Sequence, residues 1–341
     1  MNNNVGGTGV QILPVAEDDD GTRLDKWMLR HFPGLGKGEI YKWMRKGQIR
    51  LDSGRVKPDT RVYAGQEVRI PPVPASAYQP YKKSQEREMT AEGRKKAREI
   101  LQDMIVYEDD VVLVLNKPYG MATQGGTKVS QHIDGLVRAL ETDTVTPRLV
   151  HRLDKETSGI LVVAKTLKAA QALGEAFKTR DAQKFYWAVV APSPKMNDGI
   201  IEAPLAKGKS GGGERVMVDE ESGKYARSEY WVIEKAHRKA AWVCLKPETG
   251  RTHQLRVHAA LMGSPIIGDS KYNDPEMEIE IEDISHADKL HLHARRLIVP
   301  HPSGRGILDV TAPLPVHMRE TFAYFEFDPQ LGDELPEDMQ P

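Results

Sequence analysis

Hydrophobic residues near the start of the chain recur every three or four positions, as they do along one face of a helix. The first such stretch holds Leu24, Trp27, Met28 and Phe32, and the second holds Ile40, Trp43 and Met44. Polar and apolar residues then alternate through "QIRLDSGRVKPDTRVYAGQEVRIPP", which has turn residues at 52–54 and 64–65 and is typical of short strands. We therefore predict a small domain of two helices and a hairpin region over 21–72.

Beyond this domain the pattern favours strands. Apolar or alternating runs predict strands at 110–118, 159–166, 184–192, 227–236 and 240–250, and helical spacing predicts helices at 90–104, 168–179 and 252–262. Many strands of mixed spacing with few helices indicate an α+β fold. We expect a catalytic domain over 99–325, built on a mainly antiparallel, mixed sheet.

The remaining segments show neither periodicity. Residues 1–20 are expected to form a flexible tail, and the proline-rich start of 73–98 indicates a linker. A Gly-rich stretch at 206–224 is expected to form a long hairpin loop, and 326–341 an acidic C-terminal tail.

Charge is distributed unevenly, although the net charge of the 341-residue chain is only −1. Residues 21–72 carry twelve Lys or Arg against five Asp or Glu, whereas 320–341 carries seven Asp or Glu and no Lys or Arg. A second acidic block lies at 274–288. A basic domain of this kind can bind a polyanion such as RNA. The residues expected to contact phosphates lie on or just after the second helix, off its apolar face: Lys42, Arg45, Lys46 and Arg50.

The composition, 39% hydrophobic and 28% charged, is that of a globular protein. No apolar run is long enough to cross a bilayer, and the N-terminus lacks the basic and apolar segments of an export signal. The lone Cys244 lies in an apolar, strand-like run, which favours a buried structural thiol over a nucleophile. We expect a cytoplasmic protein that does not enter membranes.

The segment "PRLVHRLDKETSGILVVAKT", at 147–166, places a charged cluster directly before an apolar strand. Apolar neighbours such as Leu153 indicate that the loop is partly buried. The carboxylate of Asp154 would then need a nearby cation to stay ionised, and His151 and Arg152 lie in the same loop. Two interpretations fit this pattern: a catalytic carboxylate at the mouth of a core, and a salt-bridged turn with a capping Asp.

A second cluster, "KPETGRTHQLRVHAALMG" at 246–263, runs from a strand through a turn into a helix. Arg251 stands at the junction and is suited to pair with a carboxylate from another loop, since Arg binds carboxylates with two hydrogen bonds. His253 and Arg256 lie away from the helix face expected to meet the core. An ordinary helix with exposed basic residues is the alternative.

A third candidate is the strand "AQKFYWAVV", at 182–190. Alternation would direct Phe185 and Trp187 to one face and Lys184 and Tyr186 to the other. The ring of Tyr186 would then either pack in the core or offer a stacking platform for a nucleotide base.

Metal and triphosphate sites are not supported. His253 and His258 are five residues apart, and the spacing and Glu of a zinc-peptidase helix are absent, so we predict no metal. The histidines are expected to bond to RNA backbone or to neighbouring carbonyl groups. The Gly-rich stretches at 116–128 and 210–214 lack the Gly-Lys-Ser/Thr ending of a P-loop.

Four segments together resemble the RluA-type pseudouridine synthases, those of the ribosomal large-subunit type. They are "NKPYGM", "HRLDKETSGILVVAKT", "KFYWAVV" and "TGRTHQLRVH…GSPIIGDSKY". The basic N-terminal domain resembles an S4 RNA-binding domain, and the matches together span 21–325. The S4 likeness alone is shared by many RNA-binding proteins, whereas the long Asp-containing motif is specific.

The resemblance implies an enzyme that breaks the N1–C1′ bond of a uridine, turns the base and rejoins it through C5. This isomerisation conserves composition, so no cofactor is expected. The family's catalytic carboxylate maps onto Asp154, its basic partner onto Arg251 and its stacking tyrosine onto Tyr186. Arg152 matches the residue that fills the space left by the flipped base, and Leu297 would supply apolar packing under the pocket.

The expected partner is therefore RNA, either 23S ribosomal RNA or the assembling large subunit, and a monomer is expected. Three other hypotheses stay open. The protein could be a non-enzymatic ribosome-assembly factor that binds RNA, or a synthase acting on tRNA. It could also be a glycoside hydrolase, for which Glu156 would be the second carboxylate.

Overall fold

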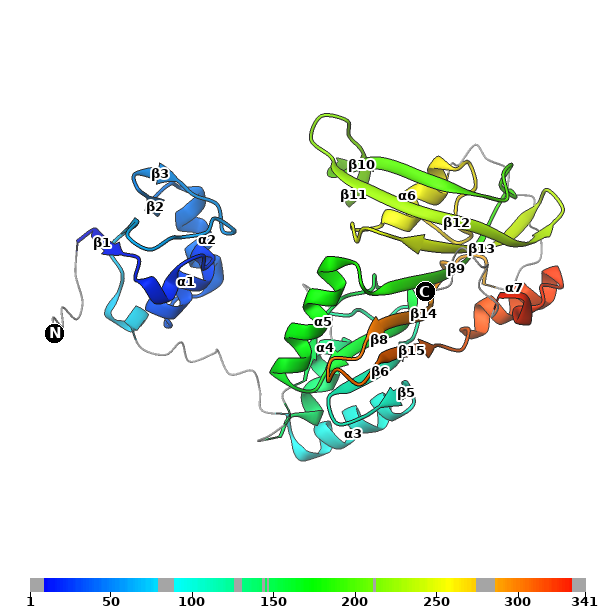
Figure 1. The fold of residues 1–341 in the computed structure, drawn as a ribbon, viewed down its shortest axis with the longest axis horizontal. Helices are drawn as coiled ribbons and strands as arrows, with labels where there is room; N and C mark the ends of the chain where they lie inside the picture. Colours follow the sequence, from blue (N-terminus) through cyan, green and yellow to red (C-terminus); the bar gives the residue numbers. More distant parts are fainter. Residues whose placement is uncertain are drawn as a thin grey trace. The chain divides into compact units, whose positions relative to one another are not determined.

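The computed structural model describes residues 9–78, 89–125, 131–142, 145, 147–210, 213–273 and 286–332. The chain divides into two compact units, Met1–Glu88 and Met89–Pro341 (Figure 1). Among the described residues, no helix combines the length and apolar character needed to cross a membrane.

The N-terminal unit packs two helices against a small sheet, as predicted. The helices are α1 (Leu24–His31) and α2 (Lys37–Arg45). The sheet has the order β1-β4-β2-β3, formed by β1 (Gln11–Pro14), β2 (Arg50–Leu51), β3 (Gly54–Arg55) and β4 (Glu67–Ile70). The apolar positions of both helices are buried in one core with Ile49, Val62 and Val68. Helical spacing therefore identified the buried face correctly.

The boundaries of this unit differ from the expected ones. The supposed tail, 1–20, contains β1, which pairs antiparallel with β4 and leads to the buried Val15. It continues through η1 (Glu17–Asp19), whose Asp19 forms an ion pair with Arg30. The supposed linker, 73–98, begins inside the same core, because Val73 and the short helix η2 (Ala75–Tyr78) pack there. A four-residue strand and a single helical turn carry too little periodicity to be detected.

The C-terminal unit is built on one large sheet. Within the described residues its strand order is β11-β10-β12-β13-β9-β14-β8-β6-β5, with β15 beside β14 and β7 beside β8. All neighbouring strands run antiparallel except β8 and β14. The mainly antiparallel sheet predicted from the sequence is confirmed. The strands are β5 (Ile105–Glu108), β6 (Val112–Lys117), β7 (Arg148–Leu149), β8 (Ser158–Ala164), β9 (Gln183–Val190), β10 (Asp198–Ser210), β11 (Gly213–Val218), β12 (Lys224–Ala236), β13 (Ala240–Pro247), β14 (Leu292–Pro300) and β15 (Ile307–Thr311).

Helices cover both faces of this sheet (Figure 1). They are α3 (Ala91–Gln102), α4 (Ile133–Val137) with η3 (Arg138–Leu140), α5 (Leu167–Thr179), α6 (Gln254–Leu261) and α7 (Val316–Phe325). Helices α3, α4 and α5 share a core with β6 and β8. The expected acidic tail, 326–341, is wrong for its first part, because Phe327 and η4 (Pro329–Gly332) pack on the α7 side, and 333–341 lies outside the described residues.

Strand β9 is central and separates two environments by alternation. Phe185 and Trp187 lie in the core with α7, while Ala188 and Val190 pack towards α6 on the other face. Cys244, on the adjacent β13, is buried, and burial raises the pKa of its thiol to about 12, so it is a structural thiol as expected.

The parallel pair β8 and β14 brings the Asp154 loop to this sheet. Gly159 has φ +107°, and a Cβ atom there would overlap the backbone of Ala294. Only glycine allows so close an approach. The close contact with β14 therefore fixes the position of the loop at 150–157, which leads into β8, relative to β9 on the other side of β14.

Candidate active site

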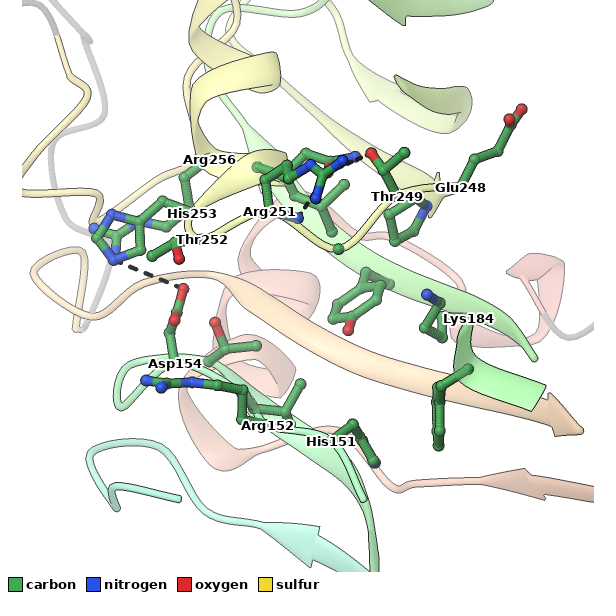
Figure 2. A pocket seen from close by; sticks show the side chains of 18 of the residues that line it. His151, Arg152, Asp154, Lys184, Glu248, Thr249, Arg251, Thr252, His253 and Arg256 are labelled. Carbon is green, nitrogen blue, oxygen red and sulfur yellow. Dashed lines mark hydrogen bonds and ion pairs between the residues drawn. The ribbon is translucent and has the colours of Figure 1, made fainter. Parts of the chain in front are cut away.

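A pocket of about 470 Å³ opens in the C-terminal unit between the Asp154 loop, β9 and the turn between β13 and α6 (Figure 2). Every site residue expected in this domain except Leu297 lines it: His151, Arg152, Asp154, Tyr186, Arg251, His253 and Arg256. Segments far apart in sequence therefore meet at one place.

Backbone hydrogen bonds hold the Asp154 loop. The hydroxyl of Thr123 donates to the carbonyl of Leu153 at 2.7 Å and accepts the N–H of Leu153 at 3.2 Å. The N–H of Thr157 donates to the carbonyl of Asp154 at 3.2 Å. The side chain of Asp154 is 25% exposed, so its carboxylate faces the pocket from a fixed loop and is partly removed from water.

A buried lysine lies behind this loop. The ammonium of Lys117 donates to the carbonyl oxygens of Pro118, Met121 and Lys155 at 3.0, 2.8 and 3.2 Å. Three acceptors match the three protons of an ammonium group. Burial lowers the pKa of Lys117 to about 7, and the negative charge of Asp154 opposes this lowering. Lys117 thus ties the 117–121 turn to the Asp154 loop.

Tyr186 lies on the pocket face of β9, as alternation predicted, and packs against the core beneath. Burial raises the pKa of its phenol, and the charge of Asp154 raises it further. The phenol is therefore protonated at neutral pH.

The structure gives the two arginines of the β13–α6 segment opposite environments. Arg251 is exposed, and its Nε donates to the carbonyl of Tyr225 at 3.1 Å. Its backbone N–H donates to Gln254 Oε1 at 3.0 Å, which fixes the turn. Among the described residues, the charged or titratable side chain that approaches the carboxylate of Asp154 most closely is His253, at 3.8 Å, and not the expected Arg251.

Arg256 is the buried guanidinium of the site. It forms two hydrogen bonds of 2.7 Å with Asp269, and its Nη1 lies 3.0 Å from Glu156 Oε2. Burial opposes its charge, but Asp269, Glu156 and Asp154 together raise the pKa of Arg256. Arg256, and not the exposed Arg251, is therefore the buried guanidinium within electrostatic reach of Asp154.

The imidazole of His253 lies between Asp154 and Tyr272. His253 begins α6 in the left-handed conformation, φ 53°, and its Nε2 lies 3.8 Å from Asp154 Oδ2, as Figure 2 shows. Its Nδ1 lies 2.8 Å from the hydroxyl of Tyr272.

The remaining predicted residues are placed as follows. His151 accepts the N–H of Val162 at 2.8 Å and stacks on Phe177, and burial lowers its pKa to about 3, so it is a neutral structural residue of the pocket wall. Arg152 is exposed beside Asp154 (Figure 2). Leu297 is buried in the core against which Tyr186 packs and does not line the pocket.

In the N-terminal unit, Lys42, Arg45 and Lys46 are exposed on or next to α2. Arg50 is half-buried and donates to the carbonyls of Gly47 and Ser53 at 3.3 and 3.1 Å. The exposed side chains of Lys42, Arg45 and Lys46 are therefore accessible to a phosphate, whereas the side chain of Arg50 also stabilises a turn.

Several site residues were not identified by sequence reasoning: Lys117, Thr123, Lys184, Asp269 and Tyr272. Lys117, Asp269 and Tyr272 lie within "NKPYGM" and "GSPIIGDSKY", so their motifs marked them without giving their roles.

A partly buried carboxylate, a neutral phenol and buried cations around a concave site can hold a planar base and act on its sugar. Comparison with known proteins identifies the family. Residues 111–261 match the family model for RNA pseudouridylate synthase. Ribosomal large subunit pseudouridine synthase C of Haemophilus ducreyi is 36% identical over 92% of this chain and 95% of that protein.

The protein of the same name from Escherichia coli (strain K12) is 36% identical over 89% of this chain and 93% of its own. Among solved structures, human RNA pseudouridylate synthase domain containing 4 has a TM-score of 0.56 at 28% identity, covering 69% of this chain and 97% of that one. These matches confirm the resemblance found in the sequence. The chain belongs to the RluA-type family of RNA pseudouridine synthases.

Proposed function

We propose that this enzyme converts specific uridines of 23S ribosomal RNA to pseudouridine, acting on a nucleotide flipped into the Asp154 pocket. The observation that carries the proposal is the convergence of Asp154, Tyr186 and Arg256 in one pocket of a chain whose relatives are named ribosomal large subunit pseudouridine synthases. The target base must leave its stack, because the carboxylate lies inside a pocket that a paired base cannot enter.

The carboxylate of Asp154 has three possible roles at the flipped uridine. It can form an ester at C1′, stabilise positive charge that develops there, or remove a proton from the sugar. Each role requires the ionised form. The charge of Asp154 raises the pKa of Arg256 and opposes the lowering of the pKa of Lys117, so both groups lie within electrostatic reach of the carboxylate.

The phenol of Tyr186 supports the base in this proposal. A protonated phenol on the pocket floor offers a π face for stacking and a proton donor near C5 of the turned base. Exposed Arg152 lies next to Asp154 and is suited to occupy the gap that the flipped base leaves in the RNA.

The N-terminal unit would hold the RNA through phosphate contacts. Lys42, Arg45 and Lys46 present charges off the core face of α2, and such contacts make binding sensitive to salt. The isomerisation conserves the atoms of the uridine, so the proposal includes no cofactor. The protein would act in the cytoplasm, where ribosomal RNA is assembled, as a monomer.

The direct test is the Asp154→Asn variant with 23S ribosomal RNA. We expect RNA binding to persist and pseudouridine formation to fall by at least about a thousandfold, because the nucleophile or base is lost while the pocket shape is kept. Asp110→Asn is the matched control, since the side chain of Asp110 is 74% exposed and, among the described residues, pairs only with exposed Arg305. It should retain full activity.

Pseudouridine formation at the normal rate by Asp154→Asn would reject the catalytic assignment. If that variant also restored a strain lacking the gene, the assembly-factor hypothesis would be favoured instead. Release of free uracil by the unaltered protein would indicate a hydrolase. Product found in tRNA and absent from 23S RNA would reject the proposed substrate.

A further inference from the structure

A chain of polar contacts runs from the β10–β11 hairpin to Asp154. The N–H of Val216, on β11, donates to the hydroxyl oxygen of Tyr272 at 3.0 Å. That hydroxyl lies 2.8 Å from His253 Nδ1, and His253 Nε2 lies 3.8 Å from Asp154 Oδ2. Tyr272 is only 7% exposed, so water does not readily replace these partners.

One arrangement of protons on Tyr272 and His253 satisfies every group in this series of contacts. The hydroxyl oxygen of Tyr272 already accepts the N–H of Val216, and its own proton needs an acceptor. If that proton is donated to His253 Nδ1, the imidazole proton sits on Nε2 and points towards the carboxylate. In the opposite tautomer, the proton of Tyr272 finds no acceptor among these contacts of the described residues. The lone pair of His253 Nε2 then faces the negative charge of Asp154.

We propose that Tyr272 is a positioning residue that holds His253 as the neutral, Nε2-protonated tautomer, so that the Nε2–H points towards the carboxylate of Asp154. The assignment of the tautomer stands on the contacts alone. Its catalytic consequence rests on the proposed function, since it orients the carboxylate that would act at C1′.

Burial favours the neutral ring of His253. Burial lowers the pKa of His253, Asp154 opposes this, and the positive charges of Arg256 and Lys271 lower it further, with Asp269 acting in the opposite sense. A neutral donor orients the carboxylate without adding a full positive charge that would reduce its nucleophilicity.

The ring of Tyr272 is held by two guanidinium groups. Arg215 of β11 lies 5.2 Å and Arg256 of α6 lies 5.4 Å from its centroid. Tyr272 therefore connects the hairpin to the catalytic loop by its hydroxyl and by its aromatic face.

The tautomer can be observed directly by long-range ¹H–¹⁵N NMR of protein labelled at histidine, with the His253→Asn spectrum identifying the signal. We expect the unaltered protein to show the Nε2-protonated pattern at neutral pH. An Nδ1-protonated or doubly protonated ring would overturn the proposal. This spectrum is recorded without RNA, so it decides the tautomer independently of activity. If the protein formed no pseudouridine, the proposed function would be overturned, but the tautomer assignment would not.

The variant Tyr272→Phe tests the positioning role. Loss of the donor to Nδ1 should raise the pKa of His253 and move the acid limb of the kcat–pH profile to higher pH. We expect kcat to fall roughly five- to tenfold, the worth of one hydrogen bond, with KM for RNA nearly unchanged. Tyr107→Phe, on β5, which loses a phenol hydrogen bond to Asp109, is the control and should leave both profiles unchanged.

An unchanged tautomer together with an unchanged acid limb in Tyr272→Phe would overturn the positioning role. If this variant does not fold, the spectrum of the unaltered protein still decides the tautomer.

Discussion

The pair Arg256–Asp269 predicts how strongly the site depends on one buried charge. The side chains of Arg256 and Asp269 are 2% and 0% exposed, and their two hydrogen bonds are both 2.7 Å. Replacing Arg256 by Met leaves the carboxylate of Asp269 buried without its cation. Removal of one partner of a buried pair costs about 3–5 kcal/mol. At about 2 °C per kcal/mol for a domain of this size, the melting temperature should fall by roughly 6–10 °C.

The chain contains a matched control with the same fork geometry at the surface. Arg296 binds Asp309 through Nε at 2.7 Å and Nη2 at 2.5 Å, but these side chains are 26% and 42% exposed. Arg296→Met should therefore cost less than about 1 kcal/mol, or roughly 2 °C. The difference between the two variants isolates the effect of burial.

Calorimetry of three proteins tests this argument: Arg256→Met, Arg296→Met and the double variant Arg256→Met/Asp269→Asn. The double variant should melt above Arg256→Met, because an amide at 269 removes the unpaired charge and still accepts backbone hydrogen bonds. Equal losses in the two single variants would refute the claim that burial sets the cost. A double variant no more stable than Arg256→Met would refute the claim that unpaired charge causes it.

Two further predictions concern lysines. The pKa of Lys117 is about 7 in the folded protein and 10.5 in the unfolded chain. Between these pH values the unfolded chain binds one proton more than the folded protein. The free energy of unfolding should therefore rise with pH, by up to roughly 5 kcal/mol. Urea denaturation of the unaltered protein and Lys117→Met between about pH 7 and 10 measures this slope, and equal slopes would contradict the prediction. Lys184 lines the pocket, and its Nζ has no acceptor among the described residues, so we expect it to bind an RNA phosphate. Lys184→Met should then reduce the slope of log affinity against log salt by roughly 0.7–1, and an unchanged slope would exclude this contact.

Local periodicity was sufficient to predict much of this fold. The two helices of the first unit, the strands around β9 and the outward face of Tyr186 all follow from spacing within one element. Alternation predicts the side-chain directions of β9 correctly because each face of the strand packs against a different layer, so each residue belongs to one face only.

The site could be predicted only in part, because its contacts join distant segments. Arg251 and Arg256 stand five residues apart in one motif, and the local pattern does not determine which one turns inward. The structure shows that the choice depends on Gln254, which holds the turn, and on Asp269, which receives Arg256. Thr123 clamps Leu153 across thirty residues, a relationship that no spacing rule contains.

Strand β9 combines two properties on alternate residues, the lining of the pocket and the packing of the core. Lys184 and Tyr186 face the pocket, while Phe185 and Trp187 anchor the layer beneath α7. An insertion or deletion of one residue here would exchange the two sets and destroy both properties at once. Under the proposed function, a change of target uridine is therefore confined to substitutions at every second position of this strand, or to the loops around it, where length can vary.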